Sequence, residues 1–179
     1  MAKHGIQGLV GGGSAEGGAM HNVVLAWQEA HKKRGIELEL GERLCFGFHF
    51  FVAKSREEGI KLAGKYYEEN MKMFGELRLV RALSEEQIEI MRDPTRAPSA
   101  KLPRIDDAIN AGGVLCGSPE QIVEHLKAIE KRYPGLERVS VSLSVGVPKA
   151  LCLEQLELFA TEVMPEFTNQ ARTEMAMAI

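Results

Sequence analysis

The apolar positions of this chain fall into strand-like runs and helix-like stripes that alternate along the sequence. Residues 43–53 are apolar almost without a break, which is typical of a parallel strand buried on both faces. A shorter apolar run at 6–10 and an alternating run at 139–145 predict two more strands. Stretches with apolar residues at helical spacing follow each run. This order predicts a parallel sheet with right-handed crossovers.

Polar residues mark where several of the predicted helices begin. A serine followed three residues later by Glu or Gln forms a capping box, because each side chain satisfies a backbone donor of the other. The first helix is capped by Ser14 and ends at Gly35, and the last spans 151–164 before Pro165. The capping-box pattern occurs at Ser55–Glu58, Ser84–Gln87 and Ser118–Gln121.

The periodic pattern weakens between residues 76 and 113. Within this segment, residues 93–103 contain three prolines and no periodicity, which predicts a loop. Loops of this length inside a compact domain are usually lids or disordered segments. We therefore predict that 76–113 is a lid or an insertion.

Composition limits the classes of function. The chain has 179 residues, room for one domain, with 45% hydrophobic residues and a net charge of −3. That charge provides no strong field for nucleic acid or anionic membrane, and no apolar run approaches the ~20 residues of a membrane span. Three cysteines without paired spacing predict neither a disulfide framework nor a metal site. With no signal-peptide pattern at the N-terminus, we expect a cytoplasmic protein.

Three motifs in order resemble one known family. They are the strand and glycine run of residues 2–17, the Val-Ala-Lys-Ser-Arg-Glu-Glu junction at 52–58, and the pair formed by 116–121 with 158–165. Together they resemble the luciferase-like flavin-dependent monooxygenases of the bacterial luciferase superfamily, and within it the limonene-monooxygenase-like branch. The resemblance implies an α/β fold, the C-terminal portion of a TIM (β/α)8 barrel with about three βα units. The barrel part would span 1–167 and a tail 168–179.

The resemblance also implies an activity. Such a protein would use FMN as reduced flavin, together with O2, to oxygenate a small organic substrate, and a flavin reductase could be a partner. The family's phosphate-binding loop and first four strands would lie before Met1, so we expect weak or no FMN binding by this chain alone. The competing interpretation is a non-catalytic, truncated module that dimerises or pairs with a companion chain.

The best candidate for a cofactor contact is the glycine run after the first strand. Backbone can approach a ligand closely there, and the amides of a following helix attract anions. A plain tight turn between strand and helix would have the same sequence. By the resemblance, the run lies beside the flavin and consists of Gly11, Gly12, Gly13 and Ser14.

Two residues are candidates for a substrate pocket. His49 is a lone histidine in an apolar strand, where a satisfied core histidine is the competing interpretation. Ser144 ends the last predicted strand, where Ser140, Ser142 and Ser144 predict a face of hydroxyl groups. The ends of parallel strands are where barrel pockets form. No residue of the sequence is assigned a catalytic role or a metal.

Overall fold

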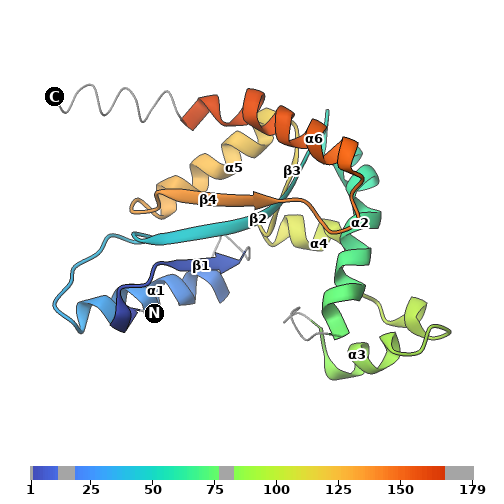
Figure 1. Ribbon diagram of the computed structural model, residues 1–179, viewed down its shortest axis with the longest axis horizontal. Helices are drawn as coiled ribbons and strands as arrows, with labels where there is room; N and C mark the ends of the chain where they lie inside the picture. The colour runs from blue at the N-terminus through green and yellow to red at the C-terminus, as the bar shows by residue number, and fades with distance from the viewer. Residues whose placement is uncertain (1, 12–18, 77–82, 168–179) are drawn as a thin grey trace.

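The computed structural model describes residues 2–11, 19–76 and 83–167 (Figure 1). A single parallel sheet forms its centre. The predicted α/β class with a parallel sheet is confirmed. The strands are β1 (Gly8–Gly11), β2 (Leu44–Val52), β3 (Val114–Gly117) and β4 (Arg138–Ser142).

Helices follow the strands as the sequence predicts, with more of them between β2 and β3 than expected. Short 3-10 turns occur at Ala2–His4 and Ala97–Ser99. The last helix continues as a π-helical turn, Phe159–Val163. The α-helices are α1 (Ala19–Lys32), α2 (Arg56–Glu76), α3 (Glu85–Met91), α4 (Ile105–Asn110), α5 (Pro119–Arg132) and α6 (Lys149–Leu158).

The central strand β2 pairs with all three others. His49 has a partner on each edge, Val114 of β3 and Ser142 of β4. Residues 45–47 likewise pair with both β1 and β4. Because a strand residue has one neighbour on each side, β1 and β3 lie end to end along one edge of β2, and β4 lies along the other. The sheet therefore has four strands but only three strand positions across.

The fourth strand corrects the sequence prediction of three. β3 has only four residues and leads directly into the capping box of α5, where Ser118 and Gln121 satisfy each other's backbone donors. Its pairing partner is the distant second half of β2, so no local signal separates it from a loop. The segment 93–103 also differs from a structureless loop, because it contains turns and a 3-10 helix.

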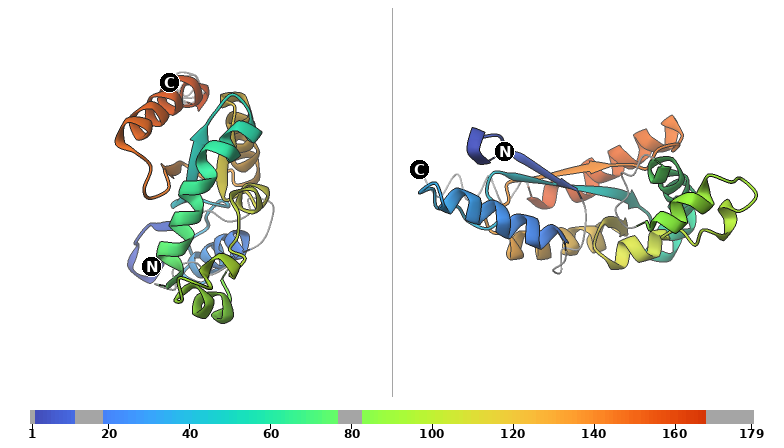
Figure 2. Two further views of the ribbon diagram at one scale, coloured as in Figure 1. Left: turned by 90° about the vertical axis from the view of Figure 1, so that its right-hand side faces the viewer. Right: turned by 90° about the horizontal axis from the view of Figure 1, so that it is seen from below.

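The two faces of the sheet are different environments. Even-numbered residues of β2 are buried against helices: Phe46 contacts Tyr133 and Phe50 contacts Phe159, each with ring centres 5.0 Å apart. α1 and α5 lie on this side of the sheet (Figure 2). α6 lies next to β4, at the end of the molecule opposite α1. The odd-numbered residues 45, 47 and 49 remain partly exposed on the opposite side. We call that side the open face.

Candidate functional site

The register of the strands determines which residues share the open face. Neighbouring residues in paired parallel strands point to the same side of a sheet. Gly11 pairs with Gly47, which pairs in turn with Ser140, so these three form one row across the sheet. His49 and Ser142 form the next row toward the carboxyl ends of the strands. The predicted hydroxyl face is thus the open face, and it carries His49.

His49 is the only titratable side chain of β2, apart from the thiol of Cys45. Its Nδ1 lies 3.5 Å from Oγ of Ser142, at the outer limit of a hydrogen bond. Burial lowers the pKa of His49 below its ordinary value, and a hydrogen bond to the backbone of Ser142 opposes this effect in part. The imidazole is therefore neutral at pH 7, and can accept a proton or a hydrogen bond on one nitrogen while it donates from the other.

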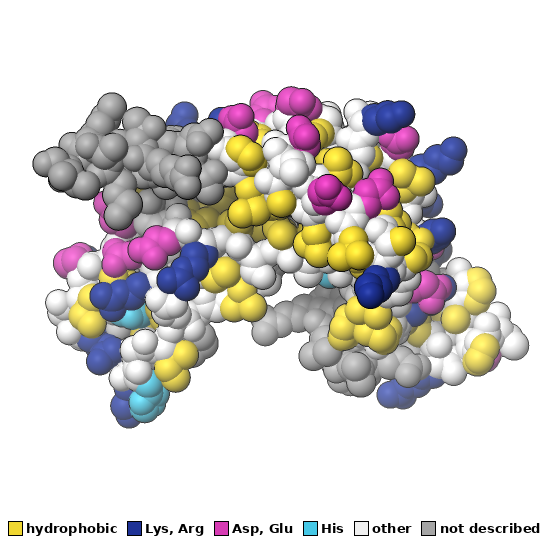
Figure 3. Space-filling view, turned by 45° about the horizontal axis from the view of Figure 1, so that its top comes forward, with side chains coloured by type: hydrophobic (Ala, Val, Ile, Leu, Met, Phe, Trp, Pro, Cys, Tyr) yellow, Lys and Arg dark blue, Asp and Glu magenta, His cyan; other side chains and the backbone are white. Residues whose placement is uncertain are grey.

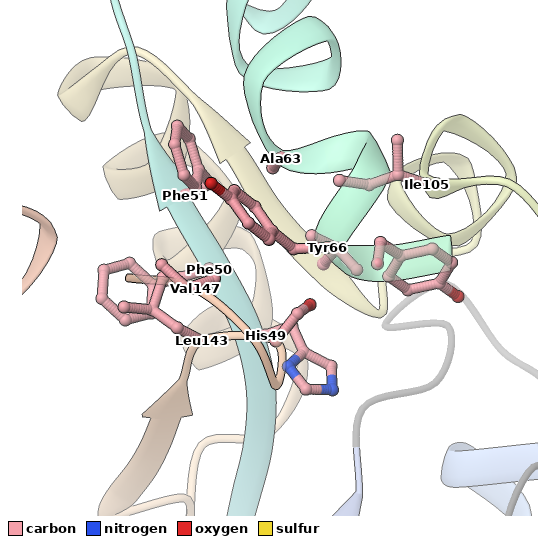
Figure 4. Close-up of a pocket in the computed structure, with 11 residues that line it drawn as sticks. His49, Phe50, Phe51, Ala63, Tyr66, Ile105, Leu143 and Val147 are labelled. Carbon is pink, nitrogen blue, oxygen red and sulfur yellow. The ribbon is translucent and has the colours of Figure 1, made fainter. Parts of the chain in front are cut away.

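The two predicted pocket residues, His49 and Ser144, line the same cleft. Figure 4 shows this cleft between β2, α2 and the segment after β4. Its volume is about 10 Å³, which suits a single water molecule. Pockets for organic ligands usually measure ~300–1,000 Å³. In this chain alone, the cleft could not enclose a flavin or an organic substrate. Apart from His49 and Ser144, its principal walls are Phe50, Phe51, Tyr66, Tyr67 and Leu143.

Sequence reasoning missed three side chains of the site. From the sequence alone, Tyr66 and Tyr67 are interpreted as helix-packing residues, but both line the cleft. Burial raises the pKa of Tyr67, and the negative charge of Asp107 adds to this, so its hydroxyl stays protonated. Ser142 was recognised only as one of several hydroxyls. Its pairing with His49 depends on a register that the sequence does not encode locally.

The glycine run is described only at its first member. Gly11 ends β1, and a Cβ built there would meet no atom within 4 Å. The described contacts therefore leave room for a ligand at this position. Gly12, Gly13 and Ser14 lie outside the described residues.

Metal-binding side chains are dispersed over the described residues, and the thiol of Cys116 is buried. In the parts of the chain that the structure describes, no three metal-binding side chains come together. Burial raises the pKa of the Cys116 thiol to about 11, so this cysteine is a packing residue rather than a nucleophile. Within the same described ranges, no helix is long and apolar enough to cross a membrane.

Several solved structures share this fold, although no protein-family model and no curated protein matches the chain. The oxygenating constituent of 3,6-diketocamphane monooxygenase from Pseudomonas putida, in complex with FMN, superposes with a TM-score of 0.57 at 18% identity, over 92% of this chain and 44% of its own. The F420-dependent tetrahydromethanopterin reductase from Methanopyrus kandleri superposes with a TM-score of 0.54 at 20% identity, over 90% of this chain and 45% of its own. Monooxygenase RslO1 from Streptomyces bottropensis superposes with a TM-score of 0.53 at 14% identity, over 82% of this chain and 37% of its own.

These similarities concern the fold. This chain spans less than half the length of each of the three proteins. The agreement supports the predicted α/β fold with a parallel sheet. Membership of the luciferase-like family and the assignment to part of its barrel stay predictions. The limonene-monooxygenase-like branch stays a prediction.

Proposed function

We propose that this chain forms part of the active-site wall of a flavin-dependent monooxygenase, which oxygenates a small organic substrate with reduced flavin and O2. Two of the structures that share its fold are named as monooxygenases, and one of these is a complex with FMN. The match to the FMN complex covers 92% of this chain, and the match to the other monooxygenase covers 82%. Ligands of parallel α/β folds bind at the carboxyl ends of the strands, where the open face carries its polar groups.

The observation that carries this proposal is the bare row on the open face. Gly11 and Gly47 are neighbours in register, and Ser140 adds only a hydroxymethyl group. A planar ring could lie across such a row, because its own residues carry no large side chain. The ring would pack against Leu9, whose Cδ1 lies 3.8 Å from a Cβ built at Gly47. His49 and Ser142, one row further on, would hydrogen-bond to polar atoms at the edge of the ring or of the substrate.

FMN, when bound, would supply the electron transfer to oxygen, and the protein would supply binding, orientation and a dry environment. Phe51 and Leu143 would exclude water beside His49. A flavin reductase would be the source of reduced flavin. Residues 76–113 would act as the lid, since Ile105 from this segment already lines the cleft. The described residues include no cradle for the flavin phosphate.

A second function is favoured by the size of the cleft. A space of about 10 Å³ and an open sheet face are what a non-catalytic module would have if it only paired with another chain. Flavin binding separates the two proposals, because a module of that kind has no need to bind FMN.

The test is a titration of FMN with the purified chain, followed by quenching of flavin fluorescence. We expect weak FMN binding by the wild-type chain alone. Gly47→Val should bind FMN more weakly still, because the valine side chain would project from the row formed by Gly11, Gly47 and Ser140. A Cβ at Gly47 meets its nearest atoms at 3.8 Å, so this variant should fold. Gly64→Ala on α2, with its nearest atom at 3.6 Å, is the matched control. Equal binding by wild type and Gly47→Val would show that the row is not the site, and no binding at millimolar FMN would favour the module.

A further inference from the structure

Within the part of the chain that the structure describes, β1 and β4 each have an unpaired outer edge. Over these residues β4 pairs with β2 alone, and β1 pairs with β2 alone, on the opposite side. Among the described residues, neither strand makes a backbone hydrogen bond on its outer side. Free edges of this kind pair readily with another strand. Because all strands here are parallel, the β4 edge of one chain can continue into the β1 edge of another without reversing direction.

The helix beside β4 exposes an apolar stripe. Leu153, Leu156, Ala160 and Met164 recur at helical spacing along α6 and the following turn, and all four are exposed. The opposite side of this helix is buried, where Phe159 contacts β2. Hydrophobic side chains gather on this part of the surface with acidic ones beside them (Figure 3). α6 lies at the β4 end of the molecule, and α1 lies at the other end (Figure 2).

The helix beside β1 exposes a complementary stripe. Val23 and Ala26 are exposed on α1, one helical turn apart, and Ala30 continues the line. They lie on the side of α1 away from His21, whose ring contacts Tyr133 at the end of α5. The small alanines would allow a helix with large leucines to approach closely. The stripe is therefore available to a neighbour on the side away from α5.

Charges beside the two stripes have opposite signs. Glu157 and Glu162 are exposed near the α6 stripe, and no ion pair involves them among the described residues. Lys32 ends α1 with an exposed side chain, and Lys33 follows it, with its ammonium group 3.7 Å from the carboxylate of Glu29. A contact between two α6 helices would oppose carboxylates, whereas α6 beside α1 brings carboxylates toward ammonium groups.

We propose that a second copy of this chain docks head to tail, with its β1 beside β4 in parallel and its α1 beside α6. Val10 of the copy would then share the helix-covered side with Val139 and Val141. A second, identical junction closes a ring of two copies with six strand positions, because head-to-tail contacts form closed rings when the rotation permits. Closure turns both open faces inward and encloses the His49 cleft. This assembly stands independently of whether the site binds flavin.

The experiment is light scattering on the purified full chain at tens of micromolar. We expect a mass of twice 19.8 kDa. Val23→Lys on α1 and Leu156→Lys on α6 should each raise the dissociation constant at least about tenfold. Leu62→Lys on α2 is the matched control and should leave the dimer intact, since its exposed fraction of 47% is similar to the 45% of Val23 and the 49% of Leu156. Circular dichroism of each variant verifies that it is folded.

Mixing the two defective variants separates pairing of α1 with α6 from a contact between like helices, α1 with α1 or α6 with α6. Val23→Lys retains an intact α6, and Leu156→Lys retains an intact α1, so the mixture can form one unaltered junction. We expect the mixture to dimerise more strongly than either variant alone. A monomeric wild-type chain would overturn the proposal, as would a dimer that neither variant weakens, a dimer equally weakened by Leu62→Lys, or a mixture no stronger than its components.

Discussion

Gln155 should be one of the most sensitive positions of the fold. β4 ends at Ser142, opposite His49, so the last residues of β2 extend past it. Gln155 of α6 occupies the place of the missing strand: the Val52 amide donates to its Oε1 at 2.6 Å, and its Nε2 donates to the Val52 carbonyl at 3.0 Å. With an exposed fraction of 2%, the side chain leaves no water to take over these bonds.

Replacing Gln155 by Leu keeps the size of the side chain and removes both hydrogen bonds. Each buried backbone group left without a partner costs ~1–3 kcal/mol, so the free energy of unfolding should fall by about 3–5 kcal/mol. That is a large part of the ~5–15 kcal/mol that stabilises a typical domain. The melting temperature should fall by roughly 10 °C, at ~2–4 °C per kcal/mol for a chain of this size.

Urea unfolding followed by circular dichroism measures this loss, with Glu154→Leu on the exposed side of α6 as control. Gln155→Glu adds a second test. Burial should raise the pKa of the new carboxyl above ~4.3, its unfolded value. When protonated, it can donate to the Val52 carbonyl, so its stability should be greatest below pH ~4 and lost as pH rises through the raised pKa. A Gln155→Leu variant within ~0.5 kcal/mol of wild type would refute the argument.

Two further predictions concern packing and titration. A Cβ at Gly59 would lie 2.4 Å from Sγ of Cys116, so Gly59→Ala should lower the free energy of unfolding by ~1–3 kcal/mol. In urea unfolding, most of this loss should vanish in a Cys116→Ala background, whereas Gly64→Ala should show no such coupling to Cys116. Burial lowers the pKa of His49, so the stability it contributes should be complete above its unfolded pKa of 6.5 and lost as pH falls through the lower folded value. An NMR titration should find this low pKa, and Ser142→Ala should leave it low, because the hydrogen bond that partly opposes the effect of burial is made by the Ser142 backbone. A pKa of 6.5 or above would contradict the assignment of His49 to a desolvated site.

Local signals in the sequence identified most helix ends correctly. The capping boxes at Ser84 and Ser118 are both present. Gly35 ends α1 with a φ of +73°, and the Ile36 amide donates to the His31 carbonyl, as the glycine signal predicts. At Ser55 the pattern holds only in part, because its hydroxyl accepts from the Glu58 amide while the Glu58 carboxylate accepts from Lys54. These features succeed because all their partners lie within a few residues.

Features that depend on distant partners were missed. β3 is a strand because β2 offers its second half, and nothing within 114–117 indicates that pairing. Gln155 is a polar residue of the kind that usually faces solvent on a helix. Its burial depends on where β4 ends. Segment 93–103 is ordered in part by Gln87, whose Nε2 donates to the carbonyls of Ala100 and Lys101. Each case joins residues that no periodic pattern connects.

The role of His49 shows the same limit at the site itself. From the sequence, a core histidine and a pocket histidine are alternatives, because a nearly continuous apolar run hides which residues face which side. The register decides between them: a shift of one residue would turn His49 toward the helices and Phe48 or Phe50 toward the open face. The pairing of His49 with Ser142 thus places the imidazole on the open face, next to the row formed by Gly11, Gly47 and Ser140. The candidate site takes one residue from β1, two from β2 and two from β4, and only the register brings them together. For this reason the sequence predicted some of its members but not their arrangement.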